Sequence, residues 1–155
     1  MADTYSQINI HAIFAVHDRY SLITDKFADE LYKYISGILK RLDQYPLAIG
    51  GYKDHVHIFF ELSTSKSLSD VINIVKTNSS KWINERKFTQ YHFEWQLGYG
   101  AFSYSKSQRD NVIHYIMNHK EKHKKKSFKE EYLKILNDFG IKYSEKYLFN
   151  FEMDK

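Results

Sequence analysis

Residues 46–62 read PLAIGGYKDHVHIFFEL, and this stretch decides the fold. Its two halves, PLAIGGY and DHVHIFFEL, are dominated by residues that favour β-strands, and Gly50-Gly51 marks a bend between them. Two strands joined so closely are expected to pair as an antiparallel hairpin. The remaining elements can be placed outward from this hairpin.

The second strand of the hairpin has two chemically different sides. Side chains alternate in direction along a strand, so Val56, Ile58 and Phe60 share one side, which we expect to face the core. His55 and His57 project together from the other side, roughly 6.5 to 7 Å apart by the usual rise of a strand. That spacing suits two imidazoles on one metal ion. The alternative is that both histidines are simply polar surface.

The segment before the hairpin predicts one strand and one helix. Residues 5–16 alternate apolar and polar side chains, as a half-buried strand does. Residues 25–42 repeat apolar side chains at helical spacing, and Thr24 is the expected N-cap of that helix.

The segment after the hairpin predicts a second helix and a fourth strand. Residues 68–87 show helical spacing, with Ser67 near the expected cap. Residues 93–105, FEWQLGYGAFSYS, have the composition of a strand that Gly98 and Gly100 loosen.

Two further helices are expected at residues 108–122 and 128–139, the second ended by Gly140. The order strand-helix-strand-strand-helix-strand, followed by helices, predicts an α+β, ferredoxin-like βαββαβ fold with an antiparallel sheet. Helices are expected on one face of the sheet, with the other face open. We expect one domain over residues 1–155, comprising a core at 4–105, a tyrosine helix at 107–122 and a C-terminal helix and tail at 127–155.

Composition limits the chemistry that the chain can perform. The 155 residues include no cysteine, which excludes disulfides, thiolate metal sites and cysteine nucleophiles. No apolar run approaches the roughly 20 residues that span a bilayer. The start at Met1 also lacks the basic and then apolar pattern of a secretion signal. A cytoplasmic protein without membrane contact is therefore expected.

Positive charge is concentrated late in the chain. Residues 118–129 carry six lysines against one glutamate, a composition that suits a polyanion such as DNA but also suits a solvated helix end. The polar and basic residues expected to follow a phosphate backbone are Lys76, Ser79, Lys81, Arg109, Lys122, Lys124 and Lys125.

A second group of candidate site residues lies in residues 107–119, SQRDNVIHYIMNH. Tyr115 and His119 are four residues apart and share one face of the expected helix, while Val112 and Ile116 can pack toward the protein. Taken alone, such a tyrosine is commonly an amphipathic residue at a helix boundary.

The combination is more specific than either half. His55-Val56-His57 on a central strand, followed by WQLGYGAFSYS and by a helix carrying Tyr115 and His119, resembles the single-tyrosine HUH transposases of small bacterial insertion sequences. This IS200-like family is related to the REP-associated tyrosine transposases. The resemblance runs over nearly the whole chain, from TYSQINIHAIFAV through KEEYLKILNDFGIKYSEKYLF.

The resemblance implies a metal-dependent enzyme that cleaves and rejoins single-stranded DNA at insertion-sequence ends. His55, His57 and His119 would hold one Mg²⁺ or Mn²⁺, and Tyr115 would form a 5′-phosphotyrosine without a nucleotide cofactor. The implied substrate is DNA folded into a hairpin near each end. The implied assembly is a homodimer in which His55 and His57 of one subunit meet Tyr115 and His119 of the other.

One residue departs from the family pattern, because His119 stands where the family commonly has glutamine. A third imidazole would shift preference from Mg²⁺ toward Mn²⁺ or a later transition metal. Alternatively, His119 belongs to the basic stretch and the metal has two protein ligands. His11 could approach the metal from behind a ligand or lie on the surface. Trp82, Trp95 and Tyr99 are expected to be scaffold rather than base-stacking platforms.

Two other functions compete with a transposase. A non-catalytic or domesticated single-stranded nucleic-acid-binding protein could share the same open sheet and basic helices. The His-x-His pair with Tyr115 favours the enzyme over that alternative. A two-histidine phosphodiesterase would need two separated His-x-Ser/Thr motifs, and the sequence lacks them.

Overall fold

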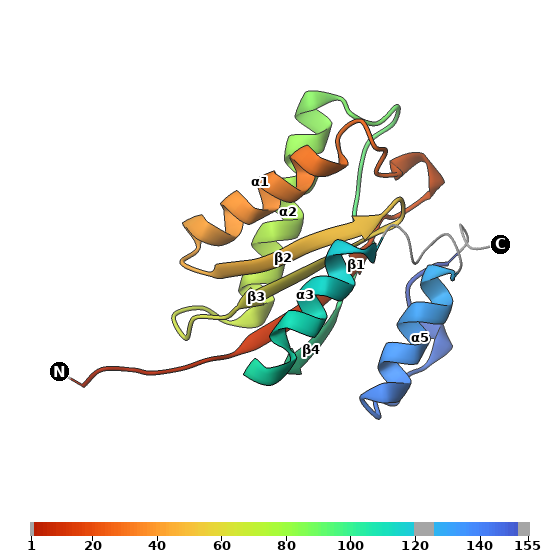
Figure 1. Cartoon of the computed structure of the whole chain (residues 1–155). Coiled ribbons are helices and arrows are strands. Elements are labelled where there is room, and N and C mark those ends of the chain that lie inside the picture. The colour runs from red at the N-terminus through yellow and green to blue at the C-terminus, as the bar shows by residue number, and fades with distance from the viewer. Residues whose placement is uncertain (1, 120–125, 152–155) are drawn as a thin grey trace.

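A computed structural model of the chain describes residues 2–119 and 126–151. A four-stranded sheet carries helices on both faces (Figure 1). The principal elements are β1 (Asn9–Ala15), α1 (Ala28–Arg41), β2 (Tyr45–Tyr52), β3 (His55–Glu61), α2 (Leu68–Arg86), β4 (Gly100–Tyr104), α3 (Arg109–Met117) and α5 (Phe128–Asp138).

The strand order is β2-β3-β1-β4, and every neighbouring pair is antiparallel. This is the predicted ferredoxin-like α+β arrangement, which is therefore confirmed. The predicted hairpin is also present, with Gly50 opposite His57. Because β3 is a central strand, its two histidines lie in the middle of the sheet, with Ala15 opposite His55 and Ile13 opposite His57.

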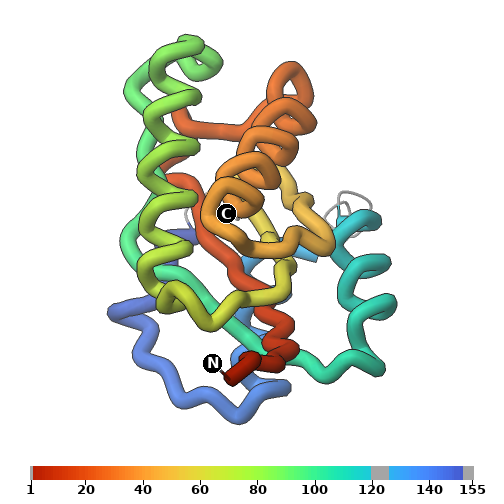
Figure 2. The backbone as a smooth tube through the Cα atoms, turned by 90° about the vertical axis from the view of Figure 1, so that its left-hand side faces the viewer, coloured from red at the N-terminus to blue at the C-terminus, as the bar shows by residue number. Residues whose placement is uncertain are grey.

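One face of the sheet forms the main core. Phe14 from β1 and Phe60 from β3 are fully buried there. They pack with Ile35 of α1 and Val75 of α2, the two helices that lie side by side over this face (Figure 2). Burial of such side chains contributes on the order of 1.5 to 3 kcal/mol each. This core fixes β1 and β3, the strands on which the histidines are placed.

The opposite face is not open, contrary to the sequence-based prediction. Two smaller apolar clusters cover it. In one, Phe128 and Leu136 of α5 pack on Ile13 of β1; in the other, Ile116 of α3 packs on Phe59 of β3. Both helices carry an apolar stripe that must be buried, and this face of the sheet accepts it.

The predicted N-cap of the first helix is wrong. Helix α1 begins at Ala28 after Phe27, which makes no side-chain capping bond. Thr24 instead closes a turn, since its carbonyl oxygen accepts hydrogen bonds from the backbone N–H groups of Phe27 and Ala28. The second helix is capped as predicted, by the Ser67 hydroxyl, which accepts from the Asp70 N–H at 3.1 Å.

The fourth strand is shorter than predicted, although its expected first half still bonds to the chain at the end of β1, where the Gln96 N–H donates to the Ala15 carbonyl oxygen at 2.7 Å. The Lys76 ammonium donates to the carbonyl oxygens of Gln96 at 2.7 Å and Gly98 at 2.9 Å. Gly98 has a φ of +83°, which breaks strand geometry. Of this first half, Trp95 alone forms an isolated bridge, with Val16. Strand β4 therefore begins only at Gly100.

The helices after the sheet also end earlier than expected. Helix α3 ends at Met117, and Asn118 caps it, so His119 follows the helix. Residues 120–122 of the predicted helix lie outside the described residues. Helix α5 ends at Asp138, close to the predicted stop at Gly140, which has a φ of +65°. Among residues 2–119 and 126–151, no helix has the length and apolar character required to cross a bilayer.

Gly50 allows α3 to approach the sheet closely, which gives a test of this packing. A Cβ atom at Gly50 would lie 2.8 Å from the Ile116 carbonyl oxygen, whereas one at Gly37 in α1 would meet nothing within 4 Å. We expect Gly50→Ala to lower the free energy of unfolding by about 1 to 3 kcal/mol through overpacking. Gly37→Ala should raise it by about 0.5 to 1 kcal/mol. Urea titration measures both, and equal effects would contradict the close approach.

Candidate active site

The candidate site is a group of buried polar side chains between the sheet and the two helices that cover it. His55 and His57 are fully buried, and His119 is 1% exposed. Glu131, from α5, is 6% exposed and joins them. Four such groups in a low-dielectric environment require close polar partners, because an unpaired buried polar group is costly.

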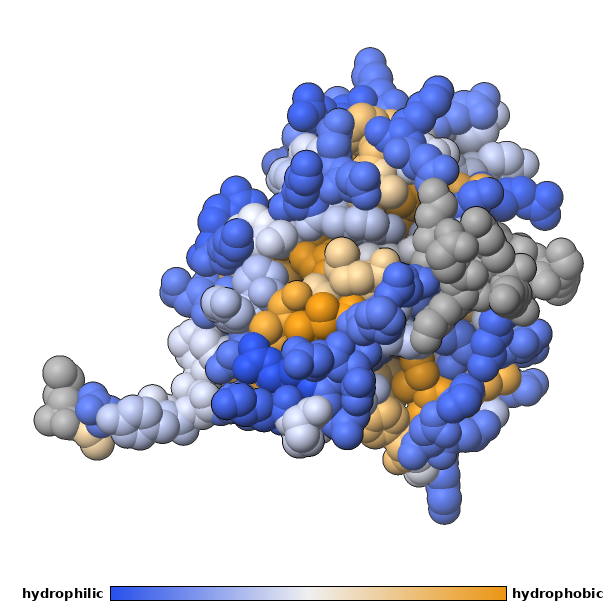
Figure 3. Space-filling view, in the orientation of Figure 1, coloured by the Kyte–Doolittle hydropathy of each residue, from blue (hydrophilic) through white to orange (hydrophobic). Residues whose placement is uncertain are grey.

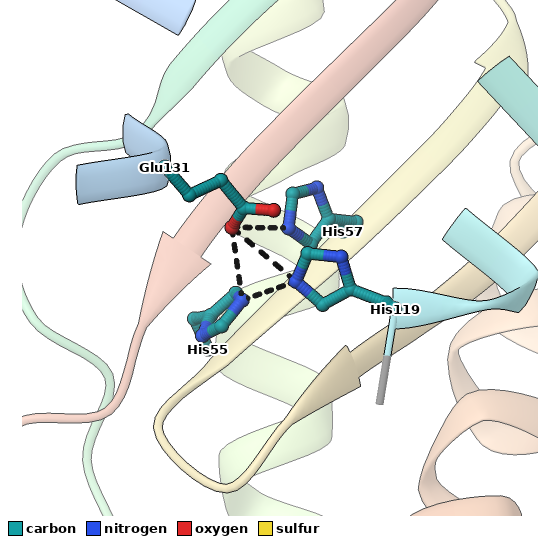
Figure 4. A group of neighbouring side chains, drawn as sticks. All are labelled: His55, His57, His119 and Glu131. Carbon is teal, nitrogen blue, oxygen red and sulfur yellow. Dashed lines mark hydrogen bonds and ion pairs between the residues drawn. The ribbon is translucent and has the colours of Figure 1, made fainter. Parts of the chain in front are cut away.

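The donor atoms of this group converge. The Oε1 atom of Glu131 lies 3.4 Å from the Nε2 atom of His55 and 3.3 Å from each of the Nε2 atoms of His57 and His119. The Nε2 atoms of His55 and His119 are 2.7 Å apart. Figure 4 shows the four side chains turned toward one another. One potential ligand atom from each residue lies within 4.8 Å of all the others.

Groups behind the cluster fix the orientation of the rings. The Nδ1 atom of His55 is 2.7 Å from the Asp54 Oδ1 atom, and the Nδ1 atom of His57 is 2.6 Å from the Nε2 atom of His11. Phe128 stacks on the His55 ring with centroids 3.9 Å apart and planes 4° apart. A histidine bonded through one ring nitrogen presents the other to a metal. Each Nε2 atom on the strand therefore faces the cluster.

The electrostatics differ between the two strand histidines. Burial, followed by the neighbouring His119, lowers the pKa of His57 to about 3, which keeps its imidazole neutral. Burial also acts to lower the pKa of His55, but hydrogen bonds with the Asp54 and Glu131 carboxylates outweigh it and raise that pKa. Neutral imidazole is the form that ligates metals.

The cluster fits a divalent cation. Three imidazole nitrogens and one carboxylate oxygen point at a common centre, with the strand histidines oriented from behind. Such a donor set suits Mn²⁺ and later transition metals better than Mg²⁺, which prefers oxygen ligands. We conclude that His55, His57, His119 and Glu131 could together hold one ion.

Tyr115 lies beside this cluster in the same chain. Its hydroxyl donates a hydrogen bond to the Oε2 atom of Glu131, and its ring centroid is 5.5 Å from that of His119. Burial, and then the Glu131 charge, raise the pKa of the Tyr115 hydroxyl well above its usual value, so the phenol keeps its proton in this state. Tyr115 also lines a cavity of about 570 Å³ together with His11, Tyr104 and Asn111.

The structure brings together the residues that sequence reasoning grouped at the site: His55, His57, Tyr115 and His119. Of the two positions predicted for His11, the structure shows the one behind a ligand: His11 is buried and contacts the His57 ring. The four grouped residues meet within one chain. The shared, two-subunit site that the family resemblance implies stays a prediction.

Sequence reasoning missed Glu131. A signal for it exists in the C-terminal helix, where helical spacing places Glu131 on the same side as Phe128 and Tyr132. All three are buried. A charged residue within the apolar face of a helix is unusual, and here it marks a polar site beneath that face.

The predicted DNA-contacting residues divide into two groups. Those on α2 lie with the main core, on the far side of the sheet from the histidines. Lys76 is half-buried and bonded to backbone carbonyl groups, and Ser79 is fully buried, where its hydroxyl accepts from the Trp95 Nε1–H at 3.0 Å. Neither position suits a DNA contact. Lys81 is exposed and lies 3.9 Å from Glu85.

Of the remaining predicted DNA-contacting residues, Arg109 lies on the side of the site. Arg109 is the first residue of α3, the helix that carries Tyr115. Lys122, Lys124 and Lys125 lie outside the described residues. The aromatic residues expected to be scaffold agree with that role, since Trp95 is buried in the main core and Trp82 and Tyr99 pack against it.

The chain is similar to transposases in sequence and in structure. Residues 4–119 match the profile of a family described as "Transposase IS200 like". A candidate transposase from Deinococcus radiodurans R1 is similar in structure, with a TM-score of 0.60 and 19% identity over 77% of this chain and 97% of that one. A REP-associated tyrosine transposase bound to a REP hairpin gives a TM-score of 0.55 and 12% identity, over 76% and 70% of the two chains. No curated protein sequence matches this chain.

The third histidine of the cluster can be tested by restoring the family's usual residue. We expect His119→Gln to lower Mn²⁺ affinity by about tenfold while changing Mg²⁺ affinity less, because an amide oxygen replaces an imidazole nitrogen. His114→Gln, an exposed change on α3, is the matched control and should alter neither. Calorimetric titration of the metal-free protein gives both affinities. Unchanged Mn²⁺ affinity in His119→Gln would exclude His119 as a ligand.

Proposed function

Because this chain belongs to the IS200-like transposase family, whose members are DNA-cleaving enzymes, we propose that it cleaves and rejoins single-stranded DNA at insertion-sequence ends through Tyr115. One observation carries the proposal. The Tyr115 hydroxyl lies within hydrogen-bonding contact of a buried cluster of three histidines and a glutamate that could hold a metal ion. A nucleophile placed beside such a cluster is suited to attack on a phosphodiester.

The proposed reaction exchanges one ester bond for another. The Tyr115 oxygen attacks the scissile phosphorus and gives up its proton, and the bond from phosphorus to the 3′ oxygen breaks. The leaving 3′ oxygen takes up one proton, so a 5′-phosphotyrosine and a free 3′-hydroxyl result. Attack by a different 3′-hydroxyl reverses the step and rejoins the strand. Because the ester energy is conserved, no nucleotide cofactor is needed. When bound by His55, His57 and His119, Mg²⁺ or Mn²⁺ would polarise the phosphate and stabilise charge on the leaving oxygen.

The substrate would reach Tyr115 through the 570 Å³ cavity between α3 and α5. Lys126 lines its wall, as does Lys134, whose ammonium pairs with the Asp138 carboxylate at 2.7 Å. A lysine at this wall is suited to a phosphate contact. We also propose that Arg109 and the lysines of residues 118–129 contact the DNA backbone. The similar REP-associated transposase is described as bound to a REP hairpin, which supports a hairpin substrate for this chain as well. The cytoplasmic location expected from the sequence is part of this proposal.

We further propose that the protein acts as a homodimer of complete sites. Strand β2 lies at the edge of the sheet, where unpaired backbone groups can accept a strand from another chain. In the view of Figure 3, apolar residues gather in the middle of the molecule, where Figure 1 places β2 and α3. Leu47, Ile49 and Met117 line a hollow there, and Met117 is 65% exposed. A second copy would bring a second site to the other DNA end.

The nucleophile is tested by looking for the covalent intermediate. Wild-type protein incubated with labelled, hairpin-tailed single-stranded DNA and Mn²⁺ should form a protein–DNA adduct that resists denaturation. Tyr115→Phe should form none, and chelation of the metal should abolish the adduct. Tyr147→Phe, which alters a tyrosine that is 80% exposed, should behave as wild type. DNA binding without any adduct in the wild type would favour the non-catalytic nucleic-acid-binding protein.

The location of the site within one chain is tested by mixing inactive variants. His57→Ala and Tyr115→Phe each remove half of the site, and we expect their mixture to form no more adduct than either alone. A site shared between subunits would behave differently. In mixed dimers, the intact histidines of one chain would meet the intact tyrosine of the other, and the adduct would reappear. Mixing is carried out after partial unfolding and refolding so that subunits exchange.

A further inference from the structure

We propose that Glu131 holds Tyr115 beside the three histidines. One of its carboxylate oxygens faces the histidines, and the other accepts the hydrogen bond from the Tyr115 hydroxyl. This inference rests on the proposed function and extends it to a residue beyond the family match, which ends at residue 119. In this role Glu131 is a fourth donor to the cation and a positioning residue for the nucleophile.

The two oxygens of Glu131 have different partners. Oε1 lies 3.3 to 3.4 Å from the Nε2 atoms of His55, His57 and His119. Oε2 accepts the hydrogen bond from the Tyr115 hydroxyl. A carboxylate can satisfy both at once because it carries two oxygens with several acceptor positions. Because one carboxyl carbon joins the two oxygens, the carboxylate would set the distance from the nucleophile to a bound cation.

Contacts elsewhere on α5 fix the position of Glu131. Phe128 stacks on the His55 ring, and Tyr132 and Leu136 are buried in the apolar cluster on the sheet. Ser127 caps the helix, with its hydroxyl accepting from the Glu130 N–H at 3.1 Å. The carboxylate therefore reaches the cluster from a docked helix, so its position does not depend on the Tyr115 contact alone.

The Glu131 carboxylate is almost completely buried, so it needs polar or charged partners. The Glu131 side chain is 7% exposed, and a carboxylate withdrawn from water is costly unless charged or hydrogen-bonding partners compensate it. The phenol of Tyr115 contributes to that compensation, and a cation among the histidines would add to it. Tyr115 itself lies on α3, and Glu131 is the contact that ties its hydroxyl to α5.

Two variants separate the two roles of the carboxylate, and Glu130→Gln is the matched control because Glu130 is the exposed neighbour on the same helix. Glu131→Ala removes both oxygens. We expect its Mn²⁺ dissociation constant to rise about tenfold or more. We also expect adduct formation at saturating Mn²⁺ to slow about 100-fold, because the phenol is no longer positioned. Glu131→Gln keeps an amide oxygen for Tyr115, so it should bind Mn²⁺ as weakly as Glu131→Ala yet recover most of the rate.

A third measurement does not depend on cleavage. The melting temperatures of Tyr115→Phe, Glu131→Ala and the double variant are compared in metal-free buffer. Two groups that bond to each other should give shifts that do not add, whereas independent groups give additive shifts.

Three results would overturn the proposal: Mn²⁺ affinity and adduct rate in Glu131→Ala equal to those of Glu130→Gln, no recovery of rate in Glu131→Gln, or additive melting shifts. If the wild type forms no adduct, the proposed function fails instead. The Mn²⁺ titration and the melting temperatures still test Glu131 in that case.

Discussion

The fold has to bring three imidazole nitrogens and one carboxylate oxygen to the same place. Two of the nitrogens come from a central strand, while the third nitrogen and the carboxylate come from segments after the last strand. The C-terminal part of the chain must therefore return across the sheet. Burial of apolar residues of α3 and α5 against the sheet stabilises this arrangement. The histidines and Glu131 are then enclosed by these apolar contacts.

Much of this could be predicted from local patterns. The alternation around His55 and His57 predicted their shared face, because that periodicity depends only on backbone geometry. Helical spacing predicted that Tyr115 and His119 lie close together, and they do, although His119 follows the end of α3. The packing of α5 could not be predicted in the same way. It depends on Phe128 meeting the His55 ring, a contact between residues far apart in the sequence. For this reason the second face of the sheet was expected to be open.

The partners of polar side chains were the hardest to predict, because the sequence does not distinguish a polar residue that contacts DNA from one that bonds within its own chain. Lys76 and Ser79 look suited to a phosphate backbone in sequence, but in the structure they hold the segment before β4 and the Trp95 ring. Glu131 is the reverse case. A glutamate on a late helix suggests a solvated surface, although its helical spacing from Phe128 and Tyr132 places it on the apolar face of α5.

The order of the site residues along the chain has a consequence for synthesis. The strand histidines are made early, Tyr115 and His119 follow, and Glu131 comes from the last of the packed helices. A growing chain therefore carries the strand histidines and the tyrosine before it carries the carboxylate that joins them. Because α5 can dock only after it leaves the ribosome, the complete site is assembled only after the sheet that supports it has been made.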